Sequence, residues 1–444
     1  MVSVITSFSR ITILSYILIF TIIDLALIFE PKLNDVVAGI LTTIQSVMVV
    51  LFLCNGAAVL YFSKGDSNII LYTAFQLVFF IALAIVLNKL FIPASPALTN
   101  NILLLLSFGF ITIERLNLDK SVKQLIYAIV SLFITTIVIL IIREISDISR
   151  FLFVFAIIGA LSLIAITLAG NIEYGARLSF NILGIRIQPS ELVKLSFIFF
   201  LAGCIVKYRD FKGYLFSTIG ALVHVLILVH SKDLGTALIF MATFVFLTFI
   251  AYKNYILLAL EIGLGLIGGI VAYNTFPHIR TRFIAWSDPL SVVDDKGYQI
   301  SQSLFAIGTG SWFGSGLNKG MPTKIPVVTN DFIFAAISEE MGAIVAICLI
   351  LIYMCTSICF FNVAFKCHNS FYMLVVSGIA VDFSLQTILN IGGVIKFIPS
   401  TGVTLPFISY GGSSLLSMFL AFFIAQCSDG LWRPMKGSRK YHEE

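Results

Sequence analysis

Apolar stretches long enough to cross a lipid bilayer recur along the whole chain, and they restrict its fold more than any other feature. Roughly thirteen of them approach the length of a membrane-spanning helix. They cover residues 11–29, 38–62, 69–92, 99–113, 124–142, 151–169, 190–206, 215–230, 234–251, 255–273, 332–361, 372–396 and 407–427. Runs of this length satisfy their backbone hydrogen bonds in lipid as helices. The sequence therefore predicts an all-α polytopic membrane protein.

The composition supports a membrane protein and argues against other classes. The chain is 59% apolar and only 11% charged, whereas a soluble domain carries about 25% charged residues. Its net charge is +5, and no block of lysine or arginine indicates nucleic-acid binding. The seven cysteines lie mostly within apolar stretches and lack the paired spacing of metal ligands. We therefore expect neither a zinc site nor a disulfide framework.

Basic residues predict the orientation in the plasma membrane. With the C-terminal tail, residues 431–444, in the cytoplasm, the short inner loops hold eleven lysines and arginines. The short outer loops after residue 170 then hold four, or nine with the long segment 274–330 included. Positive residues favour the cytoplasmic side, so this orientation is preferred and places residues 274–330 outside the cell. The stretch 11–29 lacks a signal-peptide cleavage pattern, and we expect it to remain as a helix.

The segment 274–330 is long and polar for a connection between two apolar stretches. It contains two of the three tryptophans, Trp286 and Trp312, and charged residues that include Arg280 and Arg282. A loop of this length is more often functional or disordered than a simple spacer. The apolar and aromatic residues that follow Gly297 argue against disorder. We therefore predict a large functional loop on the outer face.

Two further polar clusters fall on the same predicted face. The first contains Arg186, Glu191 and Lys194, and the last two share one helix face because they are three residues apart. They form either an ion pair at a helix mouth or part of a site. The second, residues 231–236, contains Asp233, which either caps the following helix or contributes to the same site.

The stretch 399–414 is dense in glycine and proline within an apolar region. That composition predicts a broken backbone, which is tolerated at membrane depth only where protein buries it or where it lines a cavity. Together with the loop and the two clusters, it predicts a polar cavity that opens outward.

Asp331 stands where the long segment meets the next apolar stretch. It either caps the helix that follows, which lowers a carboxylate pKa, or lies desolvated at the edge of the apolar phase, which raises it. In the second case it suits the role of a general base.

Glu339 and Glu340, deeper in that stretch, need partners or a function. Asp382, Gln386 and Asn390 share one helix face, and we expect them to form hydrogen bonds between helices.

Several motifs resemble the SEDS family, the RodA, FtsW and SpoVE proteins of bacterial wall growth and division. They are Arg186-Ile-Gln-Pro-Ser-Glu-Leu-Val-Lys-Leu-Ser196, Asp233-Leu-Gly-Thr236, Gly297-Tyr-Gln-Ile-Ser-Gln-Ser303, Asp331-Phe-Ile-Phe-Ala-Ala-Ile-Ser-Glu-Glu340 and Gly402-Val-Thr-Leu-Pro-Phe-Ile-Ser-Tyr-Gly-Gly-Ser-Ser414. Their order and spacing also match, and the resemblance covers about residues 99–430.

The resemblance implies a peptidoglycan polymerase that uses lipid II as donor and acceptor, inverts the anomeric centre, and works with a class B penicillin-binding protein. It implies Asp331 as the catalytic residue. The expected substrate-binding residues are Arg186, Glu191, Lys194, Asp233, Arg280, Arg282, Gln299, Gln302, Ser409, Gly411 and Ser413. A divalent cation is compatible with this chemistry, although no ligand cluster is evident in the sequence.

This chain departs from the family in two respects. Family members usually have about ten spans, so residues 1–95 are expected to be an accessory segment of about three helices before a core at 96–430. Val292 and Val293 also occupy positions where many relatives have an Asp-Pro pair, and the run 325–330 lacks the Glu and His often found there.

Two other classes of function remain open at this stage. A flippase or secondary transporter would place charges at the middle of the bilayer and broken helices in paired halves. In this sequence the charges gather on one predicted face instead. A non-catalytic scaffold for a transpeptidase is the second alternative, and the presence of Asp331 argues against it.

Overall fold

The computed structural model describes residues 2–30, 34–90, 94–145, 147–173, 176–182, 185–208 and 210–432. Within these residues, 12 helices are long and apolar enough to cross a bilayer. One further helix, α16 (Gly412–Trp432), has a shorter apolar part at Gly412–Ser428. The predicted all-α polytopic membrane fold is confirmed.

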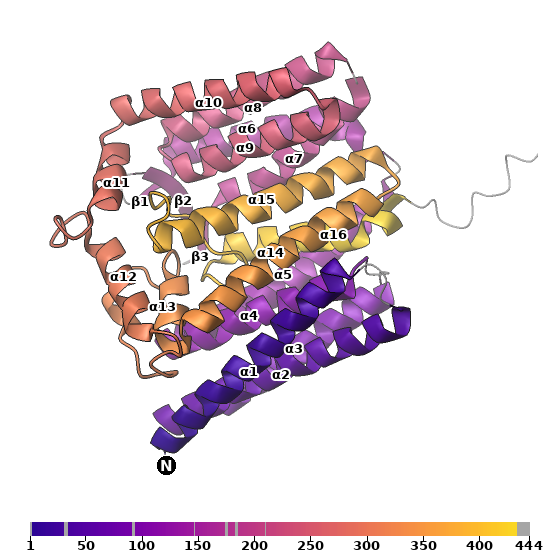
Figure 1. Ribbon diagram of the computed structural model, residues 1–444. Helices are drawn as coiled ribbons and strands as arrows, with labels where there is room; N and C mark the ends of the chain where they lie inside the picture. The colour runs from indigo at the N-terminus through magenta and orange to yellow at the C-terminus, as the bar shows by residue number, and fades with distance from the viewer. Residues whose placement is uncertain are drawn as a thin grey trace, which may run out of the picture.

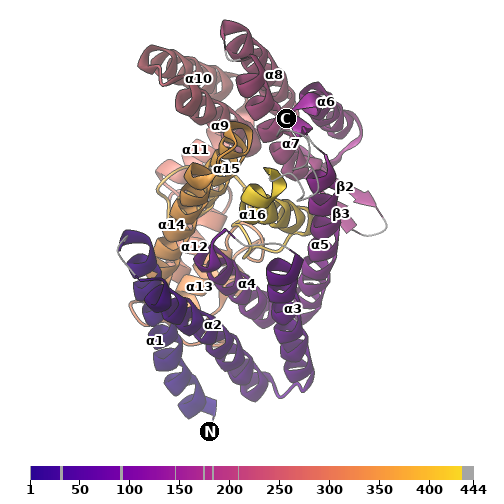
Figure 2. The same cartoon turned by 90° about the vertical axis from the view of Figure 1, so that its right-hand side faces the viewer.

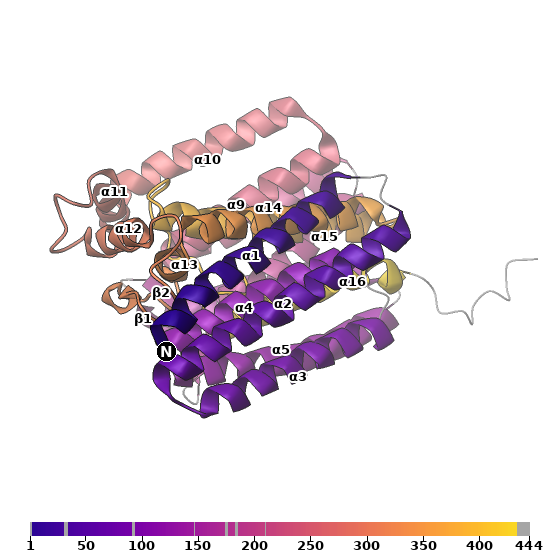
Figure 3. The ribbon, with the colours of Figure 1, turned by 60° about the horizontal axis from the view of Figure 1, so that its bottom comes forward.

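Three helices come first in the chain and lie along one side of the bundle (Figure 3). They are α1 (Val2–Phe29), α2 (Asp35–Lys64) and α3 (Asn68–Leu90). The Asn34 side chain accepts a hydrogen bond from the Val36 N–H and caps α2. At the other end, Gly65 closes α2 in the left-handed region, which glycine adopts without steric cost.

Ten longer helices form the rest of the bundle. They are α4 (Pro96–Leu116), α5 (Leu118–Glu144), α6 (Leu152–Ala169), α7 (Pro189–Tyr208), α8 (Phe211–His230), α9 (Leu234–Tyr252), α10 (Tyr255–Thr275), α14 (Ala343–Lys366), α15 (Ser370–Val394) and α16. The stretch predicted at 99–113 reaches 21 residues because Ser95 caps α4 and Pro96 occupies its first turn. A short 3-10 helix, η1 (Ile148–Phe151), leads into α6.

The centre of the bundle is occupied by α16, which α4, α5, α7 and α15 surround in the view down the bundle (Figure 2). Its large aromatic side chains Phe419, Phe422 and Phe423 are fully buried. The peripheral α10 contrasts with it, since only Glu261 of that helix is buried. The core therefore lies between α4, α5, α7, α14, α15 and α16.

The predicted long loop is mostly folded, and it lies at one end of the bundle (Figure 1). It contains α11 (Pro277–Ser287), α12 (Tyr298–Gly310) and a 3-10 helix, η2 (Pro322–Lys324), and it leads into the short helix α13 (Ile333–Met341). The helix α1 begins at this end too, whereas α16 ends at the opposite one (Figure 1).

A small antiparallel sheet at the same end was not predicted from the sequence. It joins β1 (Asn171–Glu173), β2 (Ala176–Ile182) and β3 (Ile185–Ile187) in that order. The signal for it was the alternation of polar and apolar residues along 177–182, which is typical of a strand with two different faces. Arg186 lies on β3, directly before the start of α7.

The apolar stretch predicted as one span at 332–361 is divided in the structure, so that prediction is wrong. Gly342 separates α13 from α14 with φ of +91°, a conformation that side chains rarely adopt. A Cβ at Gly342 would lie 2.3 Å from the backbone nitrogen of Gly314. The break therefore lets the loop backbone at Gly314 pack closely against the backbone at Gly342. The helix α13 becomes a short buried helix under the loop.

The first three helices pack directly on the core through polar as well as apolar contacts. Asn101 of α4 donates a hydrogen bond to Asp24 of α1 at 2.9 Å, and both side chains are fully buried. Tyr72 of α3 donates to the carbonyl of Ser121 in α5 at 2.6 Å. The helix α1 also packs against α14.

Candidate functional site

Asp331 lies on the turn that leads into α13. Its N–H donates to the carbonyl of Val327 at 3.3 Å, and its own carbonyl accepts from the Asn390 side chain at 3.0 Å. The N-cap of α13 is Phe332, and no side chain caps this helix. The alternative that Asp331 serves as a helix cap is therefore wrong for this structure, because only its backbone forms hydrogen bonds within the described part of the chain.

The carboxylate of Asp331 is half-buried and accepts no hydrogen bond from the part of the chain that the structure describes. Burial raises its pKa from 3.8 to about 6, against the opposing positive fields of Arg282 and Arg186. Such a group is largely ionised at neutral pH and is still basic enough to accept a proton. The carboxylate thus has the properties of a general base.

Arg282 of α11 faces Asp331 across Gly402. A Cβ on Gly402 would lie 3.7 Å from Nη2 of Arg282 and 3.7 Å from Oδ2 of Asp331. Arg282 also donates from Nη1 to the carbonyl of Ser400 at 3.1 Å, which ties α11 to the broken segment 395–411. Gly402 has φ of +74° and leaves open the space that a side chain would fill between the two charges.

The stretch 395–411 has no helix, as the density of glycine and proline predicted. It runs beside residues 327–332 and is bonded to them. The N–H of Tyr410 donates to the Thr329 carbonyl at 2.8 Å, Asn330 donates to the Tyr410 carbonyl at 3.1 Å, and the Ser409 hydroxyl donates to the Asn330 carbonyl. Asn390 bonds to both of these segments, because its side-chain amide donates to the carbonyls of Asp331 and Val403. These contacts fix the backbone of Asp331.

Two core residues that sequence reasoning did not single out support this arrangement. Gln124 of α5 donates to the Ser409 carbonyl at 3.1 Å and accepts from the Gly411 N–H at 3.3 Å. Tyr353 of α14 donates to the Pro406 carbonyl at 2.7 Å. An amide at the start of the apolar run of α5 was the available signal for Gln124, whereas an aromatic residue such as Tyr353 carries none. Gln124 therefore holds the backbone at Ser409 and Gly411 in place.

Lys194 lies at the centre of a separate buried cluster within the bundle. Its Nζ is 3.0 Å from Glu191 and 3.6 Å from Asp382, and it donates to Gln386 at 2.9 Å. The relative exposure of the Lys194 side chain is 3%. The sequence alternative of an ion pair at a helix mouth is realised, with Asp382 as a second carboxylate. The predicted bonding of Asp382 and Gln386 between helices is also confirmed, whereas the prediction is wrong for Asn390, which donates to the non-helical carbonyls of Asp331 and Val403.

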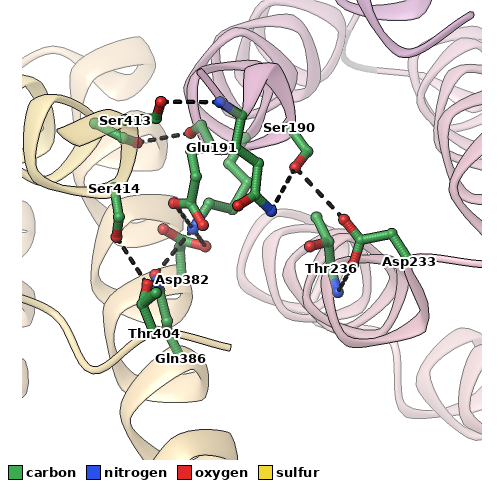
Figure 4. A network of polar contacts seen from close by, with 12 residues as sticks. Ser190, Glu191, Asp233, Thr236, Asp382, Gln386, Thr404, Ser413 and Ser414 are labelled. Atoms are coloured by element: carbon green, nitrogen blue, oxygen red, sulfur yellow. Dashed lines mark hydrogen bonds and ion pairs between the residues drawn. The ribbon is translucent and has the colours of Figure 1, made fainter. Parts of the chain in front are cut away.

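Hydrogen bonds extend this cluster to α16. Gln386 donates to Thr404 at 3.2 Å, and Thr404 bonds to Ser414 at 2.8 Å (Figure 4). The Ser413 hydroxyl accepts from the N–H of Gln188 at 2.9 Å. Thr404 belongs to the broken segment 395–411, so this one segment contacts both the buried cluster and the backbone next to Asp331.

Asp233 caps α9 through a bond from the Thr236 N–H to Oδ1 at 3.3 Å, which confirms the capping alternative. Its Oδ2 also lies 3.5 Å from the Ser190 hydroxyl (Figure 4). Burial raises the pKa of Asp233, and the nearby Arg282 opposes that shift. Asp233 therefore combines a capping role with a position beside the charges of the site.

The remaining predicted residues differ in their surroundings. Arg280 is exposed, and its guanidinium donates to the carbonyls of Tyr273 at 3.0 Å and of Asn274, at the end of α10. Arg186 is exposed on β3, and its charge reaches Asp331. Gln299 and Gln302 are half-buried near the start of α12. Of the predicted cations, Arg282 and Arg186 thus act on Asp331, while Lys194 and Arg280 are engaged elsewhere.

Glu339 and Glu340 have the partners that their burial requires. Arg115 of α4 pairs with Glu340 at 2.7 Å and donates to the Gly320 carbonyl at 2.8 Å. Glu339 accepts from the Met321 N–H at 2.8 Å. These bonds fix the loop onto α13 and show that both acids serve structure. Among the residues that the structure describes, no group of three or more His, Cys, Asp or Glu side chains is placed to hold a metal ion.

The fold and the site define a polytopic membrane protein that carries, at one end of its helix bundle, the carboxylate of Asp331 in the positive field of Arg282. Comparison with known families is consistent with that class. A family model described as "Cell cycle protein", for FtsW, RodA and SpoVE, matches residues 90–427. The chain belongs to the FtsW/RodA/SpoVE family.

Two relatives illustrate the similarity. The peptidoglycan glycosyltransferase RodA of Mycobacterium leprae is 30% identical over 372 residues, which cover 77% of this chain and 79% of that protein. An FtsW protein of Wigglesworthia glossinidia brevipalpis is 34% identical over 320 residues, which cover 69% of this chain and 83% of that protein. The matches to this family support the sequence resemblance.

Solved structures show the same fold. A chain from a peptidoglycan synthase complex, described as coordinating polymerization and crosslinking, matches with a TM-score of 0.63 at 22% identity. The match covers 77% of this chain and 99% of that one. RodA of Thermus thermophilus matches with a TM-score of 0.56 at 22% identity, over 76% of this chain and 96% of that one.

Proposed function

We propose that this chain is a peptidoglycan glycosyltransferase that polymerises lipid II at the outer face of the plasma membrane, with Asp331 as the catalytic base. Relatives named peptidoglycan glycosyltransferase support the reaction class. The observation that carries the site assignment is the Asp331 carboxylate, which has its backbone fixed, its pKa raised to about 6, and no hydrogen bond within the described residues. A structural acid would be expected to have its oxygens satisfied.

In the proposed reaction, an acceptor sugar hydroxyl attacks the anomeric carbon of a donor lipid II. The new C–O bond forms as the bond from that carbon to the pyrophosphate oxygen breaks, so the configuration inverts. The lipid pyrophosphate leaves with the bonding electrons, and the hydroxyl proton passes to the Asp331 carboxylate. General-base assistance of this kind contributes about 10²–10⁴-fold to the rate.

Arg282 is the cation best placed to serve the leaving pyrophosphate. It lies beside Asp331, and one of its nitrogens is fixed by the Ser400 carbonyl while the guanidinium retains further donors. Preorganised positive charge stabilises the charge that develops on the leaving group. Arg186 adds to the same field. Lys194 supports the site from within the bundle, because Glu191 and Asp382 already compensate its charge.

A class B penicillin-binding protein is the proposed partner, since one structural relative belongs to a synthase complex that joins polymerization to crosslinking.

The proposed orientation places residues 274–330 and Met1 outside the cell and the C-terminal tail in the cytoplasm. Cysteines placed at positions 3 and 442 in a cysteine-free background test it with impermeant thiol reagents. Equal labelling of the two positions on intact cells contradicts this orientation.

Residues 1–95 are proposed to be accessory to the reaction, because the family match begins at residue 90. A variant that begins near Ser95 and still folds is expected to polymerise lipid II. Loss of turnover in a monodisperse, thermally stable truncation contradicts the accessory role.

The experiment that tests the proposed function is polymerisation of lipid II by the purified chain in vesicles, with and without the transpeptidase partner. A glycosyltransferase yields glycan strands, a flippase moves lipid II between leaflets without strands, and a scaffold does neither. Absence of strands in both settings, with a folded protein, contradicts the proposal.

A further inference from the structure

A cavity of about 590 Å³ lies between α2, α3 and α4, at a distance from Asp331. This volume is within the range of about 300–1,000 Å³ that holds small-molecule ligands. It is lined by Thr42, Thr43, Ser46, Val49, Val50, Leu77, Phe80, Ile81, Ala84, Leu87, Asn88, Pro96, Thr99, Asn100 and Leu103. None of these residues is charged, so the cavity does not suit a free ion.

The polar residues of this cavity all gather at one end. On α2 they occupy 42–46 and give way to valines at 49 and 50, farther from the start of the helix. On α3 the apolar residues 77–87 precede Asn88, two residues before the helix ends. On α4, Thr99 and Asn100 near the start precede Leu103. Three helices therefore change from polar to apolar at a similar depth.

The polar end is held in a fixed arrangement by hydrogen bonds. Asn100 is 5% exposed, donates to the Thr42 carbonyl at 2.8 Å, and accepts from Ser46 at 2.9 Å. Thr99 accepts from Gln426 of α16 at 2.9 Å. The Asn88 side chain has no hydrogen-bond partner among the described residues, and Lys89 beside it places a positive charge at this end. Donors for a ligand thus remain available there.

The cavity opens sideways onto the apolar surface of the bundle. Val50 and Ile81, which line it, are 42% and 59% exposed. These residues lie on helices long and apolar enough to cross a bilayer, so their exposed faces contact lipid. A ligand that enters from this side comes from the membrane, and it must be apolar along most of its length.

We propose that this cavity binds one glycerophospholipid from the leaflet at the end of the bundle opposite Asp331. An acyl chain lies between α2, α3 and α4, the ester groups meet the polar end, and the phosphate lies near Lys89. The graded lining matches the change from head group to chain along such a lipid. Because the cavity is lined by α2, α3 and α4, the lipid joins the first two of these helices to the core at α4.

The test uses the full chain in vesicles of phosphatidylethanolamine and phosphatidylglycerol that contain a phosphatidylglycerol with a diazirine in its acyl chain. After illumination, labelled peptides are mapped by mass spectrometry. We expect saturable labelling of the segments 49–50 and 77–87, above the labelling of the exposed face of α10. Labelling that is equal on every exposed apolar face, and that does not saturate, overturns the proposal.

Matched variants locate the binding to the cavity. Ala84→Phe fills it, and we expect saturable labelling to fall about tenfold, because the added ring displaces the chain. Ala74→Phe, on the exposed face of the same helix and outside the cavity, should leave labelling unchanged. If Ala84→Phe does not fold, Val50→Trp blocks the opening from α2 and takes its place. Unchanged labelling in a folded, filled variant overturns the proposal.

Competition identifies the lipid class. Unlabelled phosphatidylglycerol or phosphatidylethanolamine should displace the probe, and a difference between them defines the head-group preference. Displacement by undecaprenyl phosphate alone overturns the phospholipid assignment in favour of a polyprenyl lipid. These measurements do not depend on turnover, so they stand apart from the proposed glycosyltransferase activity.

Discussion

Two groups of charged residues lie near the broken segment, and they differ in how completely their charges are satisfied. Lys194 contacts Glu191, Asp382 and Gln386, and all four side chains are buried. Asp331 is half-buried, faces Arg282 across Gly402, and accepts no hydrogen bond from the described residues. A buried ion that finds its partners serves structure, whereas one held without them is available for chemistry.

The buried cluster gives the largest expected effect. Lys194→Met leaves two carboxylates buried without a cation, and removal of one partner of a buried pair costs about 3–5 kcal/mol. We expect a marked loss of thermal stability in detergent. Lys366→Met, at an exposed lysine in the last turn of α14, is the matched control and should unfold like the wild type. Wild-type stability of Lys194→Met contradicts the structural role of the cluster.

Arg282→Gln tests the second group of charges, that of Asp331 and Arg282. Loss of one preorganised charge at a developing anion costs about 10²–10³-fold in rate. Because the Arg282 cation lowers the pKa of Asp331, its removal should also move the acidic limb of the pH profile to higher pH. Arg280→Gln is the control, since that guanidinium is bonded to the end of α10. Similar losses in both variants, with unchanged profiles, contradict the distinction between the two arginines.

The pH dependence of the wild type is the next effect in size. Asp331 must be ionised to accept a proton, and its pKa is raised to about 6. The rate of strand synthesis should therefore be nearly constant above pH 7 and fall about tenfold per unit well below pH 6. Initial rates measured between pH 5 and pH 8 at saturating lipid II provide the test. A rate that stays constant down to pH 5 contradicts this assignment of the base.

Gly402→Ala should have the smallest effect. Glycine at φ of +74° avoids a strain of about 1–2 kcal/mol, which alanine would introduce. The added Cβ would lie at ordinary contact distance from Arg282 and Asp331, so we expect lower stability with only a modest loss of rate. Gly411→Ala is the control, because a Cβ there meets only Ser414 at 3.7 Å. Equal stability of the two variants contradicts strain at Gly402.

Much of the fold followed from the sequence, because long apolar stretches have few alternatives to membrane helices. The approximate helix positions, the broken backbone at 399–414 and the Glu191–Lys194 pair all followed from length, composition and spacing. The break at Gly342 did not, since an apolar run continues through it. It depends on the close approach of Gly314, a contact between distant segments that periodicity does not reveal.

The candidate site was predicted only in part, for a related reason. Polar motifs identified the residues that gather at one end of the bundle, but not which of them bond to one another. Lys194 and Arg282 are both cations within or beside these motifs, yet Lys194 is closed off by two carboxylates from α7 and α15. That difference depends on helix packing. Gln124 was missed because its role lies in contacts with the backbone of 409–411.

A comparison of Asp331→Asn with Asp382→Asn separates a catalytic carboxylate from a structural one. For each variant, the initial rate of strand synthesis from lipid II and the thermal unfolding temperature are measured on one preparation. We predict that Asp331→Asn lowers the rate by at least about 10²-fold and keeps the stability of the wild type, since asparagine preserves the shape but accepts no proton. Asp382→Asn should instead lower stability, because Lys194 loses a partner. A stable Asp331→Asn protein that polymerises lipid II at the wild-type rate would contradict the assignment of Asp331 as the catalytic base.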